Sequence, residues 1–346
     1  MILMLRTLTI IISVIISGLT HAQSHKDSLR NIYIERFPDH FFIWPLIKGR
    51  TTQFEVRQVS NSGDRLTFKP NNTAGLGFGV YIFEVGVELT FAVPINAEKE
   101  SLFGKTRATD LQLNLLGKRW GLDLFYQNYK GFYMDDPNGK IIPGAPYPQR
   151  PDLRTNNFGV NGIYFFNKRF SLRSAYNFSE RQRKSAGSFS LTGTLNFFEV
   201  QGDSALYSKK YEPVFGAGTA FSLMSMNTFS VSPGYSYTLV VKNFFANASI
   251  SLGPAYHWVD YQVAGKEFSA SSLNNFFEAR AGIGYNGKRF FCGVNFVSQT
   301  RTIKFETIQF ANSSTTFKLL FGYRFKEFGI LKKRASDLLP IIGIQK

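Results

Sequence analysis

Charged side chains of both signs alternate with apolar side chains in several segments of this sequence. Glu84 and Glu88 alternate with valines, and Lys318 and Arg324 alternate with leucine and aromatic residues. Since a β-strand points successive side chains to opposite faces, each such segment has one apolar face and one charged face. On the inner wall of a barrel, charges of mixed sign either pair across the lumen or orient and filter a solute. We favour the paired network. The candidates for this lumen-facing set are Glu84, Glu88, Asp110, Asp123, Arg169, Arg173, Glu278, Arg280, Lys318 and Arg324.

A histidine followed by serines is the second set of residue types that could do chemistry. His257 stands beside Trp258, and Ser269, Ser271 and Ser272 follow. An outer-membrane lipid hydrolase or acyltransferase would need such a base and nucleophile. No Gly-x-Ser-x-Gly or His-x-Ser pattern surrounds these residues, and a membrane-interface histidine among aromatic residues is commoner as a girdle residue. We therefore expect no catalytic residues and no enzyme activity.

Motifs that hold a metal or a cofactor are missing from the sequence. No histidine pair or cysteine cluster has the spacing of metal ligands. No glycine-rich phosphate loop occurs in a strand–helix context. We expect no cofactor-binding residues and no metal site. Cys292 is the only cysteine, which excludes an intramolecular disulfide, and we expect it to face lipid as a small apolar residue.

The elements that must position these residues are strands of about ten residues, the length that a tilted strand needs to cross a bilayer. Leu111, Leu113 and Leu115, for example, alternate with polar residues. The pattern predicts an all-β fold, an antiparallel transmembrane β-barrel of 12–14 strands. The predicted strands are 76–82, 85–91, 111–116, 120–127, 158–166, 170–178, 189–197, 231–241, 244–252, 277–285, 290–296 and 317–325.

Connection lengths predict how the barrel is oriented. Short turns that carry Lys or Arg alternate with longer stretches near 93–105, 130–153, 257–273 and 300–313. Bacterial barrels place short turns in the periplasm and long loops outside. Strand directions then require a further strand inside 200–226, around 214–226, or one misassigned turn, so that twelve and fourteen strands both fit. The proline-rich stretch 135–152 predicts a stiff external loop or one folded into the barrel mouth.

The sequence predicts that the chain is divided into four segments. Residues 1–22 have the basic start, short apolar run and small-x-small site of a cleavable signal peptide. Residues 23–50 precede the regular pattern and predict an N-terminal periplasmic, plug-like segment, whose aromatic part 33–45 lies in the barrel mouth or forms a first, irregular strand. The barrel is expected over 51–325, and 326–346 is expected to be a periplasmic C-terminal tail. These segments place the protein in the outer membrane of a Gram-negative bacterium.

The chain carries 40 Lys and Arg against 24 Asp and Glu, a net charge of +16. Export excludes nucleic acid as the partner, which leaves outer-membrane lipids, lipopolysaccharide phosphates or an anionic small solute as the counter-charge, with a merely solvated charged surface as the alternative. Arg181, Arg183 and Lys184 fall in a turn predicted to be external, where they would contact lipopolysaccharide. The aromatic end of the last strand, at Phe325, predicts recognition by the barrel-assembly machinery.

Several sequence blocks carry a resemblance. They are 68–72, 104–106, 118–120, 129–133, 150–154, 184–188, 232–235 and 237–241, for instance Tyr129-Lys130-Gly131-Phe132-Tyr133. Together they resemble an uncharacterised family of exported proteins from Bacteroidetes-type bacteria, filed as a domain of unknown function, over residues 27–325. The resemblance implies an outer-membrane location and a barrel-like fold, and it implies no catalytic residues.

The function expected from the sequence is a non-catalytic outer-membrane barrel for solute passage or envelope maintenance. Two alternatives remain open. One is the outer-membrane lipid enzyme with His257. The other is a soluble periplasmic β-barrel that binds a ligand.

Overall fold

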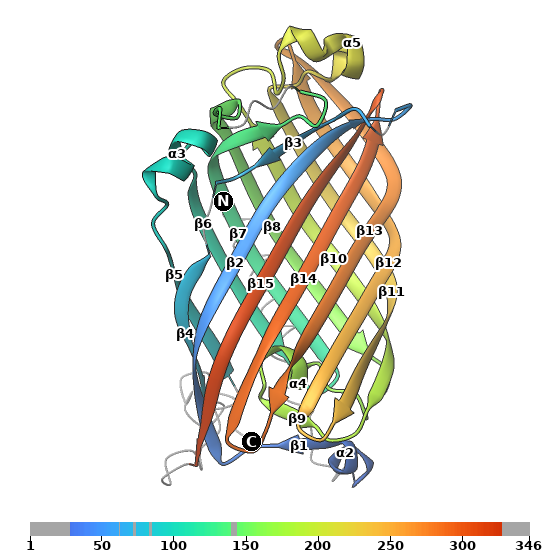
Figure 1. The fold of residues 1–346 in the computed structure, drawn as a ribbon. Coiled ribbons are helices and arrows are strands. Elements are labelled where there is room, and N and C mark those ends of the chain that lie inside the picture. The colour runs from blue at the N-terminus through green and yellow to red at the C-terminus, as the bar shows by residue number, and fades with distance from the viewer. Residues whose placement is uncertain (1–27, 62, 72–73, 83–84, 140–143, 327–346) are drawn as a thin grey trace, which may run out of the picture.

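The computed structural model describes residues 28–61, 63–71, 74–82, 85–139 and 144–326, and their main element is one closed antiparallel barrel (Figure 1). Glu84, the signal segment 1–22 and the tail after Lys326 lie outside the described residues. The predicted all-β transmembrane barrel is confirmed. The barrel strands are β2 (His40–Gln58), β3 (Arg65–Lys69), β4 (Gly75–Ile82), β5 (Val85–Ala92), β6 (Arg107–Leu116), β7 (Trp120–Asp135), β8 (Gln149–Phe165), β10 (Ala186–Gln201), β11 (Leu223–Val241), β12 (Phe244–Val263), β13 (Lys266–Asn286), β14 (Phe290–Phe305) and β15 (Ile308–Lys326).

Small elements lie at the two ends of the barrel and beside it (Figure 1). At the end where β15 finishes, which we call the lower end, are α2, β1, α4 and β9. At the opposite, upper end the short helices η1, α5 and η2 cover the barrel mouth, and α3 joins β5 to β6. Their bounds are α2 (Ser28–Tyr33), β1 (Ile34–Arg36), α3 (Ala97–Phe103), α4 (Arg173–Tyr176), β9 (Glu180–Gln182), η1 (Lys209–Tyr211), α5 (Glu212–Phe215) and η2 (Ala217–Thr219).

The wall has fewer strands in its upper half than in its lower half. In the upper half, β3 pairs with both β2 and β7 and closes a ring of ten strands. In the lower half, β2 pairs with β4 and β4 with β5, while β7 pairs with β6. Strands β5 and β6 are thus inserted between β4 and β7, so that a lower section crosses twelve strands. Among the described residues no register joins β5 to β6.

The branch between the two halves is held around Gly131. Strand β7 changes its partner from β6 to β3 across a bulge between Lys130 and Phe132. Gly131 has φ of +91°, and a Cβ there would lie 2.2 Å from the Lys105 carbonyl oxygen, so only glycine allows this approach. The Thr106 hydroxyl donates to the Gly131 carbonyl at 2.7 Å and accepts the Asn71 backbone N–H at 2.8 Å. Three of the resemblance blocks, 68–72, 104–106 and 129–133, therefore meet at one point.

The outer face of the wall is apolar. Outward side chains such as Leu76, Phe91, Leu111, Phe189 and Leu273 are each more than half exposed. A soluble protein does not expose continuous rows of this kind, because they would drive association in water. The wall is therefore a lipid-facing surface, and the soluble-barrel alternative is wrong. No helix within the described ranges is long and apolar enough to cross a membrane.

The inside of the barrel is layered. A polar middle contains buried Ser, Thr and Asn side chains of the wall, among them Thr155, Asn157 and Ser232. An apolar cluster lies on either side. The upper-cluster includes Phe54, Phe198 and Phe310, whose ring centroids are 5.8–6.4 Å apart across three strands, together with cap residues such as Phe221.

The lower-cluster is built around the connection between β8 and β10. Phe170, Leu172 and Phe178 of this connection pack inside the barrel against wall residues such as Phe42 and Phe291. The predicted strand 170–178 is therefore wrong: the segment is a plug that contains α4. Its apolar residues Phe170, Leu172, Tyr176 and Phe178 are interleaved with polar ones as in a half-buried strand, but here the polar Ser171, Arg173 and Ser174 are buried too. Without this segment in the wall, successive strands alternate in direction and no further strand is required. The strand expected around 214–226 is instead a capping loop followed by β11.

Four other segments have bounds or structures that differ from the expected ones. Strand β2 begins at His40, so the barrel includes residues that were assigned to the 23–50 segment. What remains of that segment, α2 and β1, lies below the plug, where β1 pairs with β9. The expected long loops 257–273 and 300–313 are instead extended hairpins, which turn at Ala264-Gly265 and at 306–307. The proline-rich loop is shorter than 135–152, since β8 already starts at Gln149.

Candidate functional site

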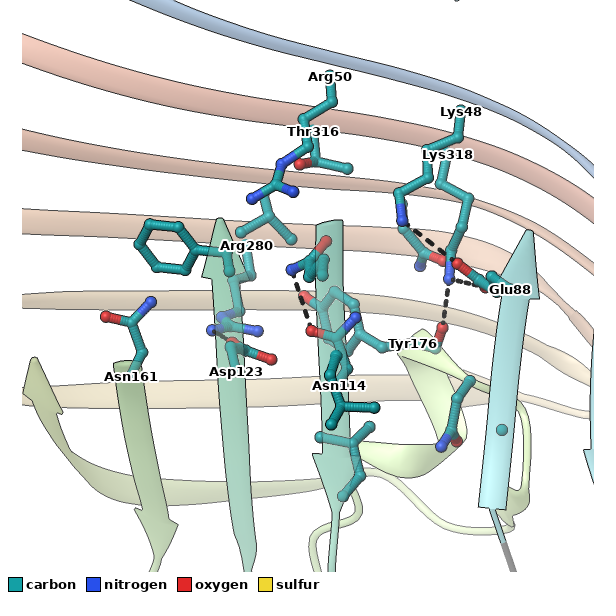
Figure 2. A pocket seen from close by; sticks show the side chains of 18 of the residues that line it. Lys48, Arg50, Glu88, Asn114, Asp123, Asn161, Tyr176, Arg280, Thr316 and Lys318 are labelled. Atoms are coloured by element: carbon teal, nitrogen blue, oxygen red, sulfur yellow. Dashed lines mark hydrogen bonds and ion pairs between the residues drawn. The ribbon is translucent and has the colours of Figure 1, made fainter. Parts of the chain in front are cut away.

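A cavity of about 170 Å³ lies in the wide lower half of the barrel, between the polar middle and the plug (Figure 2). Strands β2, β7, β8, β13, β14 and β15 form one side of it, the plug contributes Tyr176, and β5 and β6 form the remaining side. Figure 2 shows Glu88 on β5 close to Lys48 and Lys318, with Asn114 on a neighbouring strand. The charged residues that line it are Lys48, Arg50, Glu88, Asp123, Arg280 and Lys318.

Glu88 is the centre of the first charged group. Its carboxylate accepts a hydrogen bond from Lys318 at 2.8 Å and lies 3.5 Å from the Lys48 ammonium. The Trp44 indole N–H donates to it at 3.3 Å, and Lys318 also donates to the Tyr176 carbonyl at 3.1 Å. Two ammonium groups therefore share one carboxylate, which leaves an excess positive charge on the β5 side of the cavity.

Inward glycines let Trp44 lie flat against the wall here. A Cβ at Gly79 would lie 2.0 Å from the indole ring, so no other residue fits beneath it. Phe125 covers Gly159 and Phe291 covers Gly322 in the same manner. The paired strands thus use glycine to accommodate bulky neighbours within the lumen.

Asp110 is the centre of the second charged group. It forms an ion pair with Arg50 and accepts hydrogen bonds from the Gln127 amide at 3.0 Å and the Tyr129 hydroxyl at 2.9 Å. Gln127 and Tyr129 come from β7, which pairs with β6, and Arg50 comes from β2. The Asp110 carboxylate thus has one cationic and two neutral partners.

Arg280 is the centre of the third charged group. Its guanidinium donates to Glu278 at 2.8 and 3.1 Å and to Asp123, across the lumen on β7, at 2.8 Å. Glu278 also accepts from the Gln299 amide at 2.6 Å. Since Glu278 and Arg280 are both buried, the pairing is what makes their burial tolerable.

Two further arginines of the predicted set hold the plug. Arg324, 1 % exposed, donates to the carbonyls of Gly287 and Phe178 and stacks over the Phe37 ring at 4.1 Å. Arg173 lies on α4 rather than on a strand, donates to the Ser179 hydroxyl at 2.8 Å and pairs with Glu180 at 3.9 Å. Their contacts are with the plug and the lower wall.

The remaining predicted residues lie elsewhere. Arg169 is exposed at the lower end, where it lies over the Tyr33 ring, so its lumen-facing assignment is wrong. Arg181, Arg183 and Lys184 belong to β9 and the residues after it, at the end that carries the short basic turns rather than the opposite end. Arg181 is paired with Glu35 at 3.1 Å. The external turn expected there is wrong, and with it the geometry for contact with lipopolysaccharide.

His257 is enclosed in the lumen instead of lying at the outer interface. It is fully buried, and its Nδ1 forms a 2.8 Å hydrogen bond with the Thr228 hydroxyl. The neighbouring Trp258 faces outward. The girdle position expected for His257 is therefore wrong, because β12 continues through this region as a regular strand.

Lys48, Arg50 and Trp44 are cavity residues that the sequence did not reveal. They lie in the lower part of β2, where the outward residues Ile43 and Ile47 alternate with Trp44 and Leu46, so both faces are apolar and no two-residue pattern is visible. The only signal available was the pair Lys48 and Arg50 itself, two positions apart as on one face of a strand.

The upper cap contains a buried tyrosine. The Tyr207 hydroxyl lies 2.5 Å from the Thr219 hydroxyl and donates to the Gly216 carbonyl at 3.2 Å. Burial raises the pKa of Tyr207 to about 12, although the hydrogen bond with Thr219 acts in the opposite direction. The Tyr207 hydroxyl thus stays neutral over a wide range of pH, and its hydrogen bonds connect distant residues of the loop 202–222.

A closed antiparallel wall with an apolar outer face and a charged, packed interior defines a transmembrane β-barrel of the outer-membrane type. The chain belongs to the family described as "Domain of unknown function (DUF4421)", whose model matches residues 25–325. No curated protein matches the sequence.

Solved structures similar to this chain include three bacterial proteins. The attachment invasion locus protein Ail of Yersinia pestis, solved with the heparin analogue sucrose octasulfate, is 10% identical with a TM-score of 0.21, over 83% of this chain and 99% of that one. OmpT, an outer membrane protein of Vibrio cholerae, is 9% identical with a TM-score of 0.26, over 82% and 98%. Neisserial surface protein A is 5% identical with a TM-score of 0.22, over 81% and 96%.

Proposed function

We propose that this protein is a non-catalytic outer-membrane barrel that binds a small solute in a lumen closed at both ends, as part of solute passage or envelope maintenance. The lower end, where the described chain begins and ends, faces the periplasm in this proposal. The observation that carries it is the order of layers: an apolar cluster, a polar middle with a charged cavity, and a second apolar cluster. Water and ions do not cross packed aromatic clusters, so free diffusion along the barrel axis is blocked.

The charged cavity supports binding rather than catalysis. Each of the two carboxylates that line it, Glu88 and Asp123, is held by a basic partner, and paired carboxylates are poor general bases. The histidine that the enzyme alternative needs is enclosed in the lumen wall, away from the bilayer in which a lipid substrate lies.

Planar-bilayer conductance tests the closed lumen. We expect no steady conductance from the unmodified protein. The upper-cluster is opened by replacing Phe54, Phe198 and Phe310 with serine, and the lower-cluster by replacing 170–178 with a Gly/Ser linker. Each change alone should leave the barrel closed, and the two together should give steady channels.

Leucine at the same three phenylalanine positions is the matched control, because it keeps the apolar seal. Steady ohmic conductance from the unmodified protein would overturn the proposal. Conductance after one change alone would show that the other cluster does not seal the lumen, which also contradicts it.

A further inference from the structure

Between β5 and β6, the described residues show no strand pairing, which leaves an unpaired stretch in the lipid-facing wall. Strand β5 pairs only with β4, and β6 only with β7, in the part of the chain that the structure describes. The outward side chains on both sides of this stretch, including Val87, Leu89, Leu111 and Leu113, are 44–63 % exposed. Backbone N–H and C=O groups along two such edges need partners, because lipid supplies none.

The charged cavity reaches this unpaired stretch. Gly86, Val87 and Glu88 of β5 line it together with Gln112, Leu113 and Asn114 of β6. Val87 and Leu113 therefore belong to the cavity wall and to the outer surface at once, being 52 % and 44 % exposed. Gln112 and Asn114 add amide groups at the β6 edge, where one donates to the other at 3.0 Å.

The chemistry of the cavity at the β5 edge suits an anion. Lys48 and Lys318 share the single carboxylate of Glu88, and the Trp44 N–H points to the same group. Asp123, the other carboxylate that lines the cavity, is held by Arg280. An anionic oxygen beside Glu88 would therefore find one ammonium charge that no carboxylate balances.

We propose that the β5–β6 stretch is a lateral opening through which the anionic head group of a membrane amphiphile enters the cavity and binds Lys48 and Lys318. The acyl chain stays in the bilayer against Val87, Leu89 and Leu111. A cavity of about 170 Å³ is smaller than the roughly 300–1,000 Å³ of pockets that enclose a whole drug-sized ligand, so it has room for a head group alone. This proposal deepens the proposed function, since closed barrel ends leave the wall as the entrance.

Trp44 provides a direct readout. The chain has three tryptophans, and the other two, Trp120 and Trp258, face outward. Replacing both with phenylalanine leaves Trp44 as the only indole, buried against the cavity and bonded to Glu88. Stearate carrying a nitroxide near its carboxyl end should quench Trp44 fluorescence in a saturable manner when the protein is in phosphatidylcholine vesicles.

The two sources of an anionic head group are separated by a second probe. Phosphatidylglycerol with the nitroxide at the same chain position tests a phosphate head group, and labelled phosphatidylcholine tests an uncharged one. We expect at least one anionic probe to quench Trp44 about twofold or more beyond phosphatidylcholine at equal content. Which anionic probe does so identifies a free carboxylate or a lipid phosphate as the ligand.

Lys318→Met should shift the half-saturating amount of the anionic probe about tenfold upward, as expected for a lost hydrogen bond to a charged group. Lys318→Arg keeps the charge and should bind as the parent does, even if Lys318→Met proves hard to fold. Lys266→Met, at the exposed start of β13, is the matched control and should change nothing.

Equal quenching by all three probes, no quenching by either anionic probe, or an unchanged titration of Lys318→Met would each overturn the lateral opening. Cross-linking of two barrels through β5 with Trp44 unquenched would also overturn it, in favour of a second copy on this edge. A protein that is non-conducting but unquenched would refute this inference alone. A conducting protein would refute the closed lumen, whatever the quenching shows.

Discussion

The branch at which ten strands become twelve depends on a residue that cannot carry a side chain. Gly131→Ala places a methyl group at a φ of +91°, which costs roughly 1–3 kcal/mol for a residue with a Cβ. The new Cβ would lie 2.2 Å from the Lys105 carbonyl oxygen, so the 104–106 segment must move. That movement strains the Thr106 hydrogen bonds to Gly131 and Asn71, each worth roughly 0.5–1.5 kcal/mol.

The expected loss for Gly131→Ala is therefore about 2–6 kcal/mol in the free energy of unfolding. Guanidinium unfolding of the barrel in lipid vesicles, followed by tryptophan emission, measures it. Gly162→Ala in β8 is the matched control, because nothing lies within 4 Å of its Cβ and its φ is not positive. That variant should be neutral or more stable by up to about 1 kcal/mol. If the two variants unfold at the same denaturant concentration, the branch is not the rigid junction described above.

Three further predictions address the network, the cap and the lipid face. Arg280→Met leaves Asp123 and Glu278 without their counter-charge and should cost about 3–5 kcal/mol in the same assay, and adding Asp123→Asn and Glu278→Gln should recover most of it; a loss below about 1 kcal/mol would contradict the pairing. The pKa of Tyr207 is about 12 in the folded cap against 10.0 when exposed, so the cap's stability is complete below pH 10 and falls by roughly 2–3 kcal/mol as pH rises from 10 to 12. Proteolysis of 202–222 by an alkali-stable protease should therefore accelerate above about pH 10, and Tyr207→Phe should remove this dependence; equal acceleration in both proteins would refute it. Cys292 lies on the outward side of β14, half-buried, so an apolar maleimide dissolved in the bilayer should modify it and a charged thiol reagent should not, as judged by mass; equal modification by both would place it outside lipid.

The two-residue pattern located most of the wall. Strands β4 to β8 and β10 to β15 overlap the predicted segments, because each has one face on lipid and one on a polar lumen, and that contrast is visible in sequence. The lumen positions of Glu88, Asp110, Asp123, Glu278, Arg280, Lys318 and Arg324 followed from the same alternation.

The elements that the sequence did not place either imitate this contrast or lack it. The plug at 170–178 imitates it, because its polar residues Ser171, Arg173 and Ser174 are interleaved with apolar ones although both kinds are buried in the lumen. The lower half of β2 lacks it, since Trp44 and Leu46 pack against the plug while Ile43 and Ile47 face lipid. The branch at Gly131 depends on long-range pairing, which no local pattern reports.

The branch also accounts for the position of the cavity. The diameter of a barrel grows with its number of strands, so a wall of twelve strands encloses more space than one of ten. In the upper half the narrower ring is filled by its own side chains, such as Phe54 and Phe310. In the lower half the plug fills much of the extra space and leaves the region beside β5 and β6 open. The two inserted strands thus create both the space and the unpaired edges that border it. A variant that restored β5–β6 pairing would be expected to narrow the cavity and close the lateral opening together, because both arise from the same insertion.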